Sequence, residues 1–460
     1  MSTSYLAEQK NRWFDKALLV SILSIAIPVT LQTILFSSKG LIDLIMIGQL
    51  SEQDIAAVGV AGRALFVATI LLSGVTTGGA MLAAQYFGAK DYLGVTRSIA
   101  LSWMMASVAA LIPLSLFWLV GDFIIGLSSS LELVQQLGHE YLQITGLSLF
   151  CVAFSGSIAA GLRSAHQAST STWLSGIGVG LNIFLNWVLI FGHFGTPALG
   201  LKGAAIATVI SSVLEVLITI AYLRYRKHIL CFGIKDLKAA LCSKRIRQFT
   251  KLAFPTTVNF LLWSAGLFAY TAIMGRSGEQ GLVVFAVITP IEAFSLSFLV
   301  GIANASSVIV GNQLGANKPE AAYSLAIQFT IIAFFVTVAV SLGLYLCKDL
   351  ILGMFGALEE DTRQLADKFY SILCIGIILR SLPTTMVVGV LRAGGDVKFC
   401  LYQDLFTQWL FGIPLAAIGA LVLGFTPDIV FAMFFLETIF KWFACIYRFR
   451  SKKWINCLAD

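Results

Sequence analysis

Residues 28–48 read PVTLQTILFSSKGLIDLIMIG, and this stretch decides the fold. It lies in an apolar segment that begins near Lys16 and carries Asp43 in its interior. A charged carboxylate at the centre of a bilayer costs about 3 kcal/mol, so such a residue is by default a functional candidate. Pro28 predicts a bend, because proline lacks a backbone donor and clashes with the preceding turn. A bend and an ionisable group in one helix predict a moving part that is driven by an ion.

The composition indicates an integral membrane protein. The chain has 460 residues, of which 58% are hydrophobic and only 12% are charged, and its mean hydropathy is +0.87. A soluble domain averages about 25% charged residues, so this chain cannot cover itself with a water-compatible surface. The first apolar run is too long for the core of a signal peptide, so we expect it to remain as the first helix. The net charge of +7 follows the predicted loops, and no nucleic-acid partner is expected.

Apolar segments of about 20 residues mark the expected membrane-spanning helices. The sequence contains twelve of them. They cover residues 17–47, 55–81, 94–118, 137–160, 172–192, 202–223, 250–275, 281–307, 321–346, 367–391, 401–422 and 427–447. The expected fold class is therefore an all-α integral membrane protein.

One connection is longer than the others and fixes the expected topology. Residues 224–249 read RYRKHILCFGIKDLKAALCSKRIRQF and contain eight lysines and arginines. The positive-inside rule places this linker in the cytoplasm. With six spans on each side of it, both chain termini are expected in the cytoplasm as well. A polybasic segment can also bind anionic lipids, but a linker that sets topology is the simpler interpretation.

The chain repeats itself after 227 residues. This shift aligns Pro28 with Pro255, and it aligns QYFGAKD at 85–91 with NQLGANK at 312–318. Two copies of six helices have the same orientation in the membrane, so we predict two lobes related by a pseudo-twofold axis along the membrane normal. Their predicted bounds are 1–223 and 250–460, with 224–249 as the linker. Transporters built from such repeats bind substrate between the halves and rock around it.

The two copies differ where chemistry is expected, because Asp43 aligns with Tyr270. The fifth predicted helix supplies partners for the acid: Asn182 and Asn186 are four residues apart and share a helix face. Thr208, in GLKGAAIAT at 200–208, can add a hydroxyl. A carboxylate, two amides and a hydroxyl would form an oxygen-rich site for a proton or a sodium ion. The alternative is that these polar groups only hold helices together.

The second copy carries its own intramembrane charges. Glu292 and Arg380 lie in the eighth and tenth predicted helices. They could face a substrate cavity or pair with each other, because charges in membranes usually pair. Glu437 and Lys441 are four apart near the end of the last helix, where a structural pair or snorkelling is expected. Aromatic residues could form flat walls for amphipathic cations. The candidates for these cavity walls are Phe36, Trp263 and Tyr270.

These features together resemble the multidrug and toxic compound extrusion (MATE) family, in particular its bacterial DinF-like branch. The resemblance covers nearly the whole chain and rests on the repeat, on the paired inner-loop motifs and on GLKGAAIAT. It implies that Pro28 is the bending proline of the first helix and that Asp43 is the cation-coupling acid. It further implies that Asn182, Asn186, Thr208 and Ala204 surround the cation site.

The resemblance implies a function. An antiporter of this family would exchange protons for amphipathic organic cations and drugs by alternating access, with protonation of Asp43 bending the first helix at Pro28. Sodium is the alternative coupling ion, held at Asp43 and Asn182. We expect a monomer in the bacterial inner membrane, in contact with lipid, with no cofactor and no resident metal. Small-molecule cations are the expected partners.

The sequence departs from the family pattern at several positions. Some members have further acids in the seventh and tenth helices, where this chain has apolar residues around Trp263 and has Ser381. Lys39 lies one turn before Asp43 and is not expected from the family. If the two face each other, the ammonium favours the charged carboxylate, whereas burial disfavours it.

Three other functions fit parts of the pattern. A flippase for a lipid-linked oligosaccharide could share the fold, and it would need a charged groove open to lipid. A membrane enzyme would need paired catalytic residues at one depth. The four histidines are dispersed near the ends of the predicted spans, which argues against an enzyme with a metal site. A passive channel predicts flux that does not respond to proton or sodium gradients.

Overall fold

The computed structural model describes residues 16–126, 131–353 and 360–459, and within these ranges the chain is helical without a strand. Eleven of the described helices are long and apolar enough to span a membrane, and a bent pair brings the number to twelve. The prediction of an all-α membrane protein with twelve spans is confirmed. The unbroken spans are α1 (Lys16–Ile47), α2 (Glu52–Gly88), α3 (Tyr92–Leu119), α7 (Ala168–Phe191), α8 (Gly200–Tyr225), α10 (Ser243–Ser277), α11 (Glu279–Gly315) and α12 (Pro319–Leu346).

The fourth span differs from its prediction. It was expected as one helix over 137–160, but it consists of α5 (Glu132–Gly146) and α6 (Leu149–Ser164), which meet at 45°. Gly146 lies at the break, and the Ser148 hydroxyl donates to the carbonyl oxygen of Thr145 at 2.7 Å. Gly/Ser pairs are a common cause of sharp kinks, because the serine side chain competes for a backbone carbonyl.

The last three spans are interrupted as well. The π-helix η1 (Thr385–Leu391) follows α14 (Glu360–Thr384), which contains Pro383. The next span is built from α15 (Val397–Asp404), the π-helix η2 (Leu405–Gly412) and α16 (Ile413–Leu421), and the last from α17 (Pro427–Met433) and α18 (Leu436–Arg450). Proline removes a backbone donor, and wide turns accommodate the mismatch. Such wide turns are frequent near functional sites.

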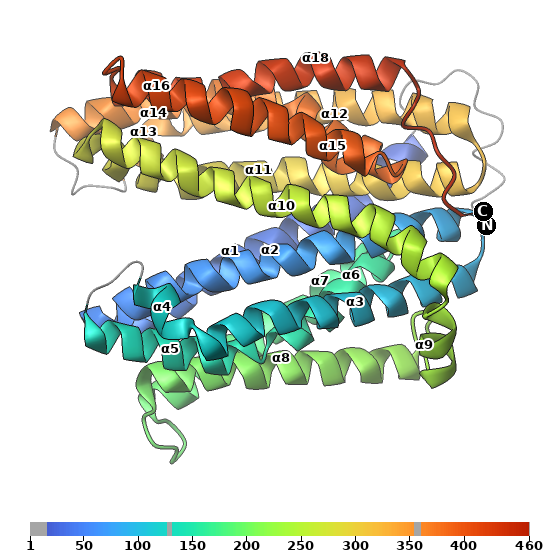
Figure 1. Ribbon diagram of the computed structural model, residues 1–460, viewed down its shortest axis with the longest axis horizontal. Helices are drawn as coiled ribbons and strands as arrows, with labels where there is room; N and C mark the ends of the chain where they lie inside the picture. Colours follow the sequence, from blue (N-terminus) through green and yellow to red (C-terminus); the bar gives the residue numbers. More distant parts are fainter. Residues whose placement is uncertain (1–15, 127–130, 354–359, 460) are drawn as a thin grey trace.

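The spans form two lobes that lie side by side in Figure 1, with α1–α8 in the N-terminal lobe and α10–α18 in the C-terminal lobe. Two buried apolar clusters each keep to one lobe, one between Tyr270 and Phe435 and the other between Ala83 and Leu230. Two larger clusters combine residues of both lobes, so the apolar core continues across the boundary. Across the boundary, α1 packs on α11, and α2 packs on α10 and α11. The predicted linker contains the short helix α9 (Ile234–Ala240) and the first turns of α10.

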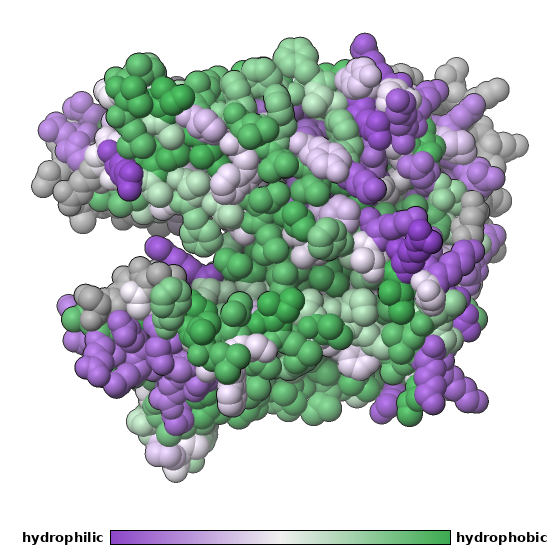
Figure 2. Space-filling model, in the orientation of Figure 1, coloured by the Kyte–Doolittle hydropathy of each residue, from purple (hydrophilic) through white to green (hydrophobic). Residues whose placement is uncertain are grey.

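The surface has an apolar belt between two more hydrophilic ends (Figure 2). At one end the space-filling view shows a deep notch between the lobes. At the opposite end, which holds the C terminus, the lobes are in contact (Figures 1 and 2). The molecule is therefore open on the face away from its C terminus.

Two glycines of the repeated motif allow the lobes to meet closely at the face that holds the C terminus. A Cβ atom on Gly88, the last residue of α2, would collide with the backbone carbonyl of Asn312, and one on Gly315, the last residue of α11, would collide with the carbonyl of Gln85. Since 85 and 88 become 312 and 315 after the 227-residue shift, these contacts are related by the internal repeat. The lobes thus meet backbone to backbone, which only glycine permits.

The C-terminal segment adds a second contact across the closed face. The backbone N–H of Leu458 donates to Oε1 of Gln85 in the N-terminal lobe at 2.5 Å. Nε2 of the same glutamine donates to the carbonyl oxygen of Ala393 in the C-terminal lobe at 2.8 Å. The Trp454 side chain is fully buried. The end of the chain is therefore part of the seal between the lobes.

Candidate functional site

The structure brings the predicted acid and its amide partner together inside the N-terminal lobe. Nδ2 of Asn186 on α7 donates to Oδ1 of Asp43 on α1 at 2.6 Å. Asn186 is 1% exposed, so the bond is largely shielded from water. A short hydrogen bond to a carboxylate in such a place stabilises the charged form and fixes its orientation.

The remaining predicted partners form a chain of hydrogen bonds behind this contact. Asn186 Nδ2 also approaches Oδ1 of Asn182 at 3.4 Å, and Asn182 Nδ2 donates to the hydroxyls of Thr208 at 3.4 Å and Ser211 at 3.3 Å. Thr208 in turn donates to the Ala204 carbonyl at 3.1 Å. All five predicted cation-site residues thus lie in one network, and Ser211 is an additional member.

One acceptor in this network is unused. Oδ1 of Asn186 is buried and has no hydrogen-bond partner among the described residues. A buried acceptor without a donor costs about 1–3 kcal/mol, so such an atom calls for an occupant. A carboxylate, an amide carbonyl and hydroxyls are oxygen ligands, and these suit a proton or a hard monovalent cation. This unused oxygen of Asn186 could not be predicted from the sequence.

Lys39 does face Asp43. Its Nζ lies 3.9 Å from Oδ2 of the acid, and the two side chains are 26% and 19% exposed. The distance is an ion-pair distance and exceeds that of a direct hydrogen bond. The lysine therefore offsets the charge of Asp43 without holding the carboxylate as tightly as Asn186 does.

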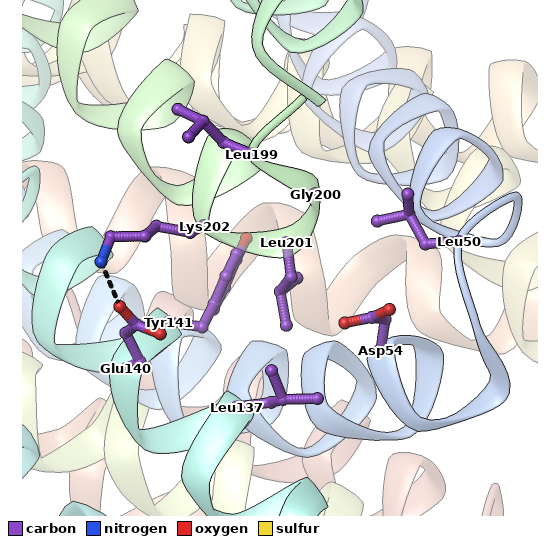
Figure 3. Close-up of a pocket in the computed structure, with 9 residues that line it drawn as sticks. All are labelled: Leu50, Asp54, Leu137, Glu140, Tyr141, Leu199, Gly200, Leu201 and Lys202. Carbon is purple, nitrogen blue, oxygen red and sulfur yellow. Dashed lines mark ion pairs between the residues drawn. The ribbon is translucent and has the colours of Figure 1, made fainter. Parts of the chain in front are cut away.

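A cavity of about 370 Å³ lies in the same lobe, between the beginnings of α2 and α8 and the middle of α5 (Figure 3). Leu50 and Asp54 line it on one side, and the α5 residues Leu137, Glu140 and Tyr141 lie on the other, with the ion pair between Lys202 and Glu140 at 2.6 Å across its rim.

Pro28 lies inside α1, which the structure shows as an unbroken helix. The Pro28 carbonyl accepts a hydrogen bond from the Thr172 hydroxyl of α7 at 2.8 Å. Phe36 is 51% exposed on the same helix. The hinge role of Pro28 and the substrate contact of Phe36 stay predictions.

Among the predicted cavity residues of the C-terminal lobe, Arg380 and Glu292 lie in the same neighbourhood as Tyr270, because the Arg380 guanidinium lies 4.9 Å from the ring centroid of Phe435, which follows Phe434 in the chain. Trp263 is 40% exposed, whereas Tyr270 is 7% exposed and stacks near Phe434 with ring centroids 4.3 Å apart. Arg380 forms an ion pair and a hydrogen bond with Glu292, so the paired alternative holds in this conformation.

Tyr270 contacts a buried cluster of charged side chains, of which the sequence predicted only the Glu437–Lys441 pair. Its hydroxyl donates to Oε2 of Glu437 at 2.6 Å. Nζ of Lys441 lies 3.1 Å from Oε1 of Glu437 and 3.1 Å from Oδ1 of Asp404. The predicted Glu437–Lys441 pair is confirmed. We name Asp404, Glu437 and Lys441 the C-lobe triad.

Sequence reasoning missed one acid of the N-terminal lobe. Glu215 lies within α8, one of the spans, and its Oε2 atom lies against Gly178 of α7. The signal was available, since a carboxylate in a predicted span is the feature that singled out Asp43.

A helical membrane protein with an internal repeat, a cleft between its halves and a buried ionisable site belongs to the class of secondary transporters. The MatE family model matches residues 28–188 and 255–418, once in each lobe. The chain belongs to this family of multidrug and toxic compound extrusion transporters.

Relatives and solved structures agree over nearly the full length. The chain is 25% identical to the uncharacterized transporter YisQ of Bacillus subtilis, covering 95% of both chains. It is 23% identical to a probable multidrug resistance protein NorM of Thermotoga maritima, covering 94% of this chain and 95% of the relative. A solved outward-facing multidrug resistance MATE transporter superposes with a TM-score of 0.84 at 19% identity, covering 94% and 96% of the two chains.

A further neighbour is instructive because of its description. A solved MOP superfamily transporter from Pyrococcus furiosus, described as having a binding pocket of reverse polarity that suggests a different function, matches with a TM-score of 0.83 at 20% identity over 96% of each chain. Identity this low shows a shared fold. The fold therefore does not determine the charge of the transported molecule, which has to be argued from the residues.

Proposed function

We propose that this transporter exports amphipathic organic cations in exchange for a cation, and that the coupling cation is a proton that binds at Asp43. The observation that supports this most directly is the partly buried Asp43–Asn186 hydrogen bond, together with the unused Oδ1 of Asn186. The probable multidrug resistance relatives favour drug-like substrates. Sodium, held by Asp43 and Asn182, is the alternative coupling ion.

The proposed cycle starts from the notched face, which the positive-inside rule assigns to the outside of the bacterial inner membrane. In that conformation a proton reaches Asp43, and the neutral acid no longer accepts a charge-assisted hydrogen bond from Asn186. We propose that α1 then bends at Pro28 and that the shape of the cavity changes. The lobes next rock until the opposite face opens, where the proton leaves and the next substrate enters.

Replacing Asp43 by asparagine is expected to abolish ion-driven efflux. Asparagine keeps nearly the same shape and cannot take up a proton or supply a charged ligand. The measurement is ethidium efflux from proteoliposomes with a proton gradient or a sodium gradient imposed separately. The wild-type protein should respond to the proton gradient, and the D43N variant should respond to neither.

The control is Asp349→Asn on the short helix α13 (Lys348–Gly353), which makes the same substitution at an exposed acid outside the site and should leave the response to the gradient intact. Ion-driven efflux by the D43N variant at the wild-type rate would disprove the coupling role. If efflux by the wild-type protein responds only to the sodium gradient, the coupling ion is sodium and Asp43 still belongs to the coupling site.

A further inference from the structure

The turn between the fourth and fifth spans has the same structure in both copies of the repeat. His166 and Gly395 have positive φ angles of 59° and 73° in the turns that lead into α7 and α15. These two residues are 229 positions apart, and so are the first residues of the two helices, Ala168 and Val397. The repeat therefore continues through these spans with a shift of 229 residues instead of 227.

In the C-terminal lobe, one buried amide joins the first helix to these two spans. The amide belongs to Asn259 of α10, which lies one turn after Pro255 and is 2% exposed. Its Oδ1 accepts a hydrogen bond from Nη2 of Arg392 at 2.6 Å, and its Nδ2 donates to Oδ2 of Asp404 at 2.8 Å. Both partners are ionised, and such hydrogen bonds are about twice as strong as neutral ones.

The N-terminal lobe has a similar arrangement with weaker bonds. The 227-residue shift places Gln32 of α1 at the position of Asn259, one turn after Pro28. Its Oε1 accepts from Nη1 of Arg163 at 3.5 Å, and its Nε2 donates to the hydroxyls of Ser175 at 2.8 Å and Ser171 at 3.3 Å.

The two arrangements correspond residue by residue. After the 229-residue shift, Arg163 becomes Arg392 and Ser175 becomes Asp404. In the N-terminal lobe the guanidinium is farther from the amide, and a neutral hydroxyl replaces the carboxylate. The first helix of the N-terminal lobe is therefore held less strongly at this position than the first helix of the C-terminal lobe.

The hydroxyl groups of α7 also allow α1 to separate at little cost. The Thr172 hydroxyl donates to the Pro28 carbonyl at 2.8 Å and also lies 3.1 Å from the Ala168 carbonyl of its own helix. Serine and threonine in a helix can bond to the carbonyl four residues back, so these hydroxyls keep a partner when α1 moves away. A carboxylate such as that of Asp404 only accepts hydrogen bonds and cannot turn to a carbonyl.

We propose that the contacts of Gln32 with Arg163, Ser171 and Ser175, which we name the α1 latch, hold α1 straight and open during transport. When the coupling cation binds, the α1 latch opens and α1 bends at Pro28, whereas the charged contacts of Asn259 keep α10 in place. Gln32 is thus a positioning residue, because it acts through the shape of α1. This inference rests on the proposed function, since it takes α1 to bend in the transport cycle.

Replacing Ser175 by aspartate gives the α1 latch the acceptor that Asp404 supplies in the other lobe. A carboxylate beside the Gln32 amide should hold α1 straight. We expect proton-driven ethidium efflux from proteoliposomes to fall about tenfold. The matched control is Ser169→Asp, which makes the same substitution at an exposed position of α7 and should leave efflux unchanged.

The shape of α1 is measured separately, as the distance between spin labels on α1 and α7. The label sites Leu41→Cys and Trp173→Cys are 60% and 75% exposed, in a background without the native cysteines. Residue 41 lies about 20 Å beyond Pro28 along the helix, so a bend of about 20° displaces its label by about 7 Å.

Three variants should change this distance in a defined way. D43N mimics the neutral acid and should populate a second distance. Q32L removes the α1 latch, so it should populate the same second distance with Asp43 intact. The double variant D43N/S175D should lose it. Gln328→Leu on α12 is the matched control for Q32L and should keep the wild-type distance.

The outcomes separate this inference from the proposed function. Efflux by S175D at the wild-type rate, a wild-type distance in Q32L or a second distance retained in D43N/S175D would overturn the α1 latch. If S175D does not fold, Q32L alone decides. If D43N is inactive and shows the second distance while Q32L behaves like the wild-type protein, the proposed function stands and this inference alone fails. If Q32L bends α1 but D43N transports at the wild-type rate, the coupling role of Asp43 fails and the α1 latch stands.

Discussion

Replacing Gly88 by alanine is expected to prevent the lobes from closing on the face that holds the C terminus. The added methyl group would collide with the backbone carbonyl of Asn312, and a backbone atom cannot turn aside as a side chain can. Overpacking of this kind typically costs about 1–3 kcal/mol, which changes a conformational equilibrium about 5–150-fold. Gly315→Ala should have the same effect, because it meets the carbonyl of Gln85.

The measurement is the accessibility of a single cysteine to a membrane-impermeant thiol reagent. The reporter Ala393→Cys lies at the seal in a background whose eight native cysteines are replaced. G88A and G315A should increase labelling of the reporter and lower efflux. Gly62→Ala on the same helix is the control, since nothing lies within 4 Å of its added methyl group. Labelling of G88A at the level of G62A would show that the close contact does not limit closure.

Replacing Lys441 by methionine is expected to destabilise the C-terminal lobe severely. Its ammonium group compensates both Asp404 and Glu437, each at 3.1 Å, and the three side chains are only 11–14% exposed. Removing one partner from a buried ion pair costs about 3–5 kcal/mol, because the remaining charges stay buried without compensation. Methionine matches the length of the lysine stem, so the loss reports the charge rather than a cavity.

The stability is best measured as the melting temperature of the purified protein in detergent. K441M should melt well below the wild-type protein, and the triple variant D404N/E437Q/K441M should recover most of the difference, because it removes all three charges. Lys202→Met is the control: its Nζ pairs with Glu140 at 2.6 Å, and the two side chains are 52% and 46% exposed. Such exposed pairs contribute about 0–1 kcal/mol. Equal melting temperatures of K441M and the wild-type protein would refute this account of the triad.

The spans could be predicted because a bilayer demands long apolar helices, and the 227-residue shift gave the two lobes. The break at Gly146–Ser148 was within reach of the same reasoning, since a glycine and a hydroxyl side chain adjoin there. The π-helices η1 and η2 could not be predicted from the sequence, because a π-helix depends on how the surrounding helices pack. The unused oxygen of Asn186 could not be predicted for the same reason, because its lack of a hydrogen-bond partner depends on how the neighbouring helices pack.

Contacts along one helix were predictable, and contacts between helices were not. Lys39–Asp43 and Glu437–Lys441 are both four residues apart, so a single helix brings them together. Asp404 joins the latter pair only through the arrangement of α15 and α18. Glu215 meets Gly178 only through the arrangement of α7 and α8. Periodicity carries no information about such neighbours.

The position of the C-terminal segment has a consequence for biogenesis. A chain is inserted into the membrane in the order in which it is translated, so the N-terminal lobe is complete long before residue 458 exists. The bond from the Leu458 N–H to Gln85 joins residues that are 373 positions apart in the chain. The N-terminal lobe is therefore synthesised without this bond, and the seal between the lobes gains it only after residue 458 has been made.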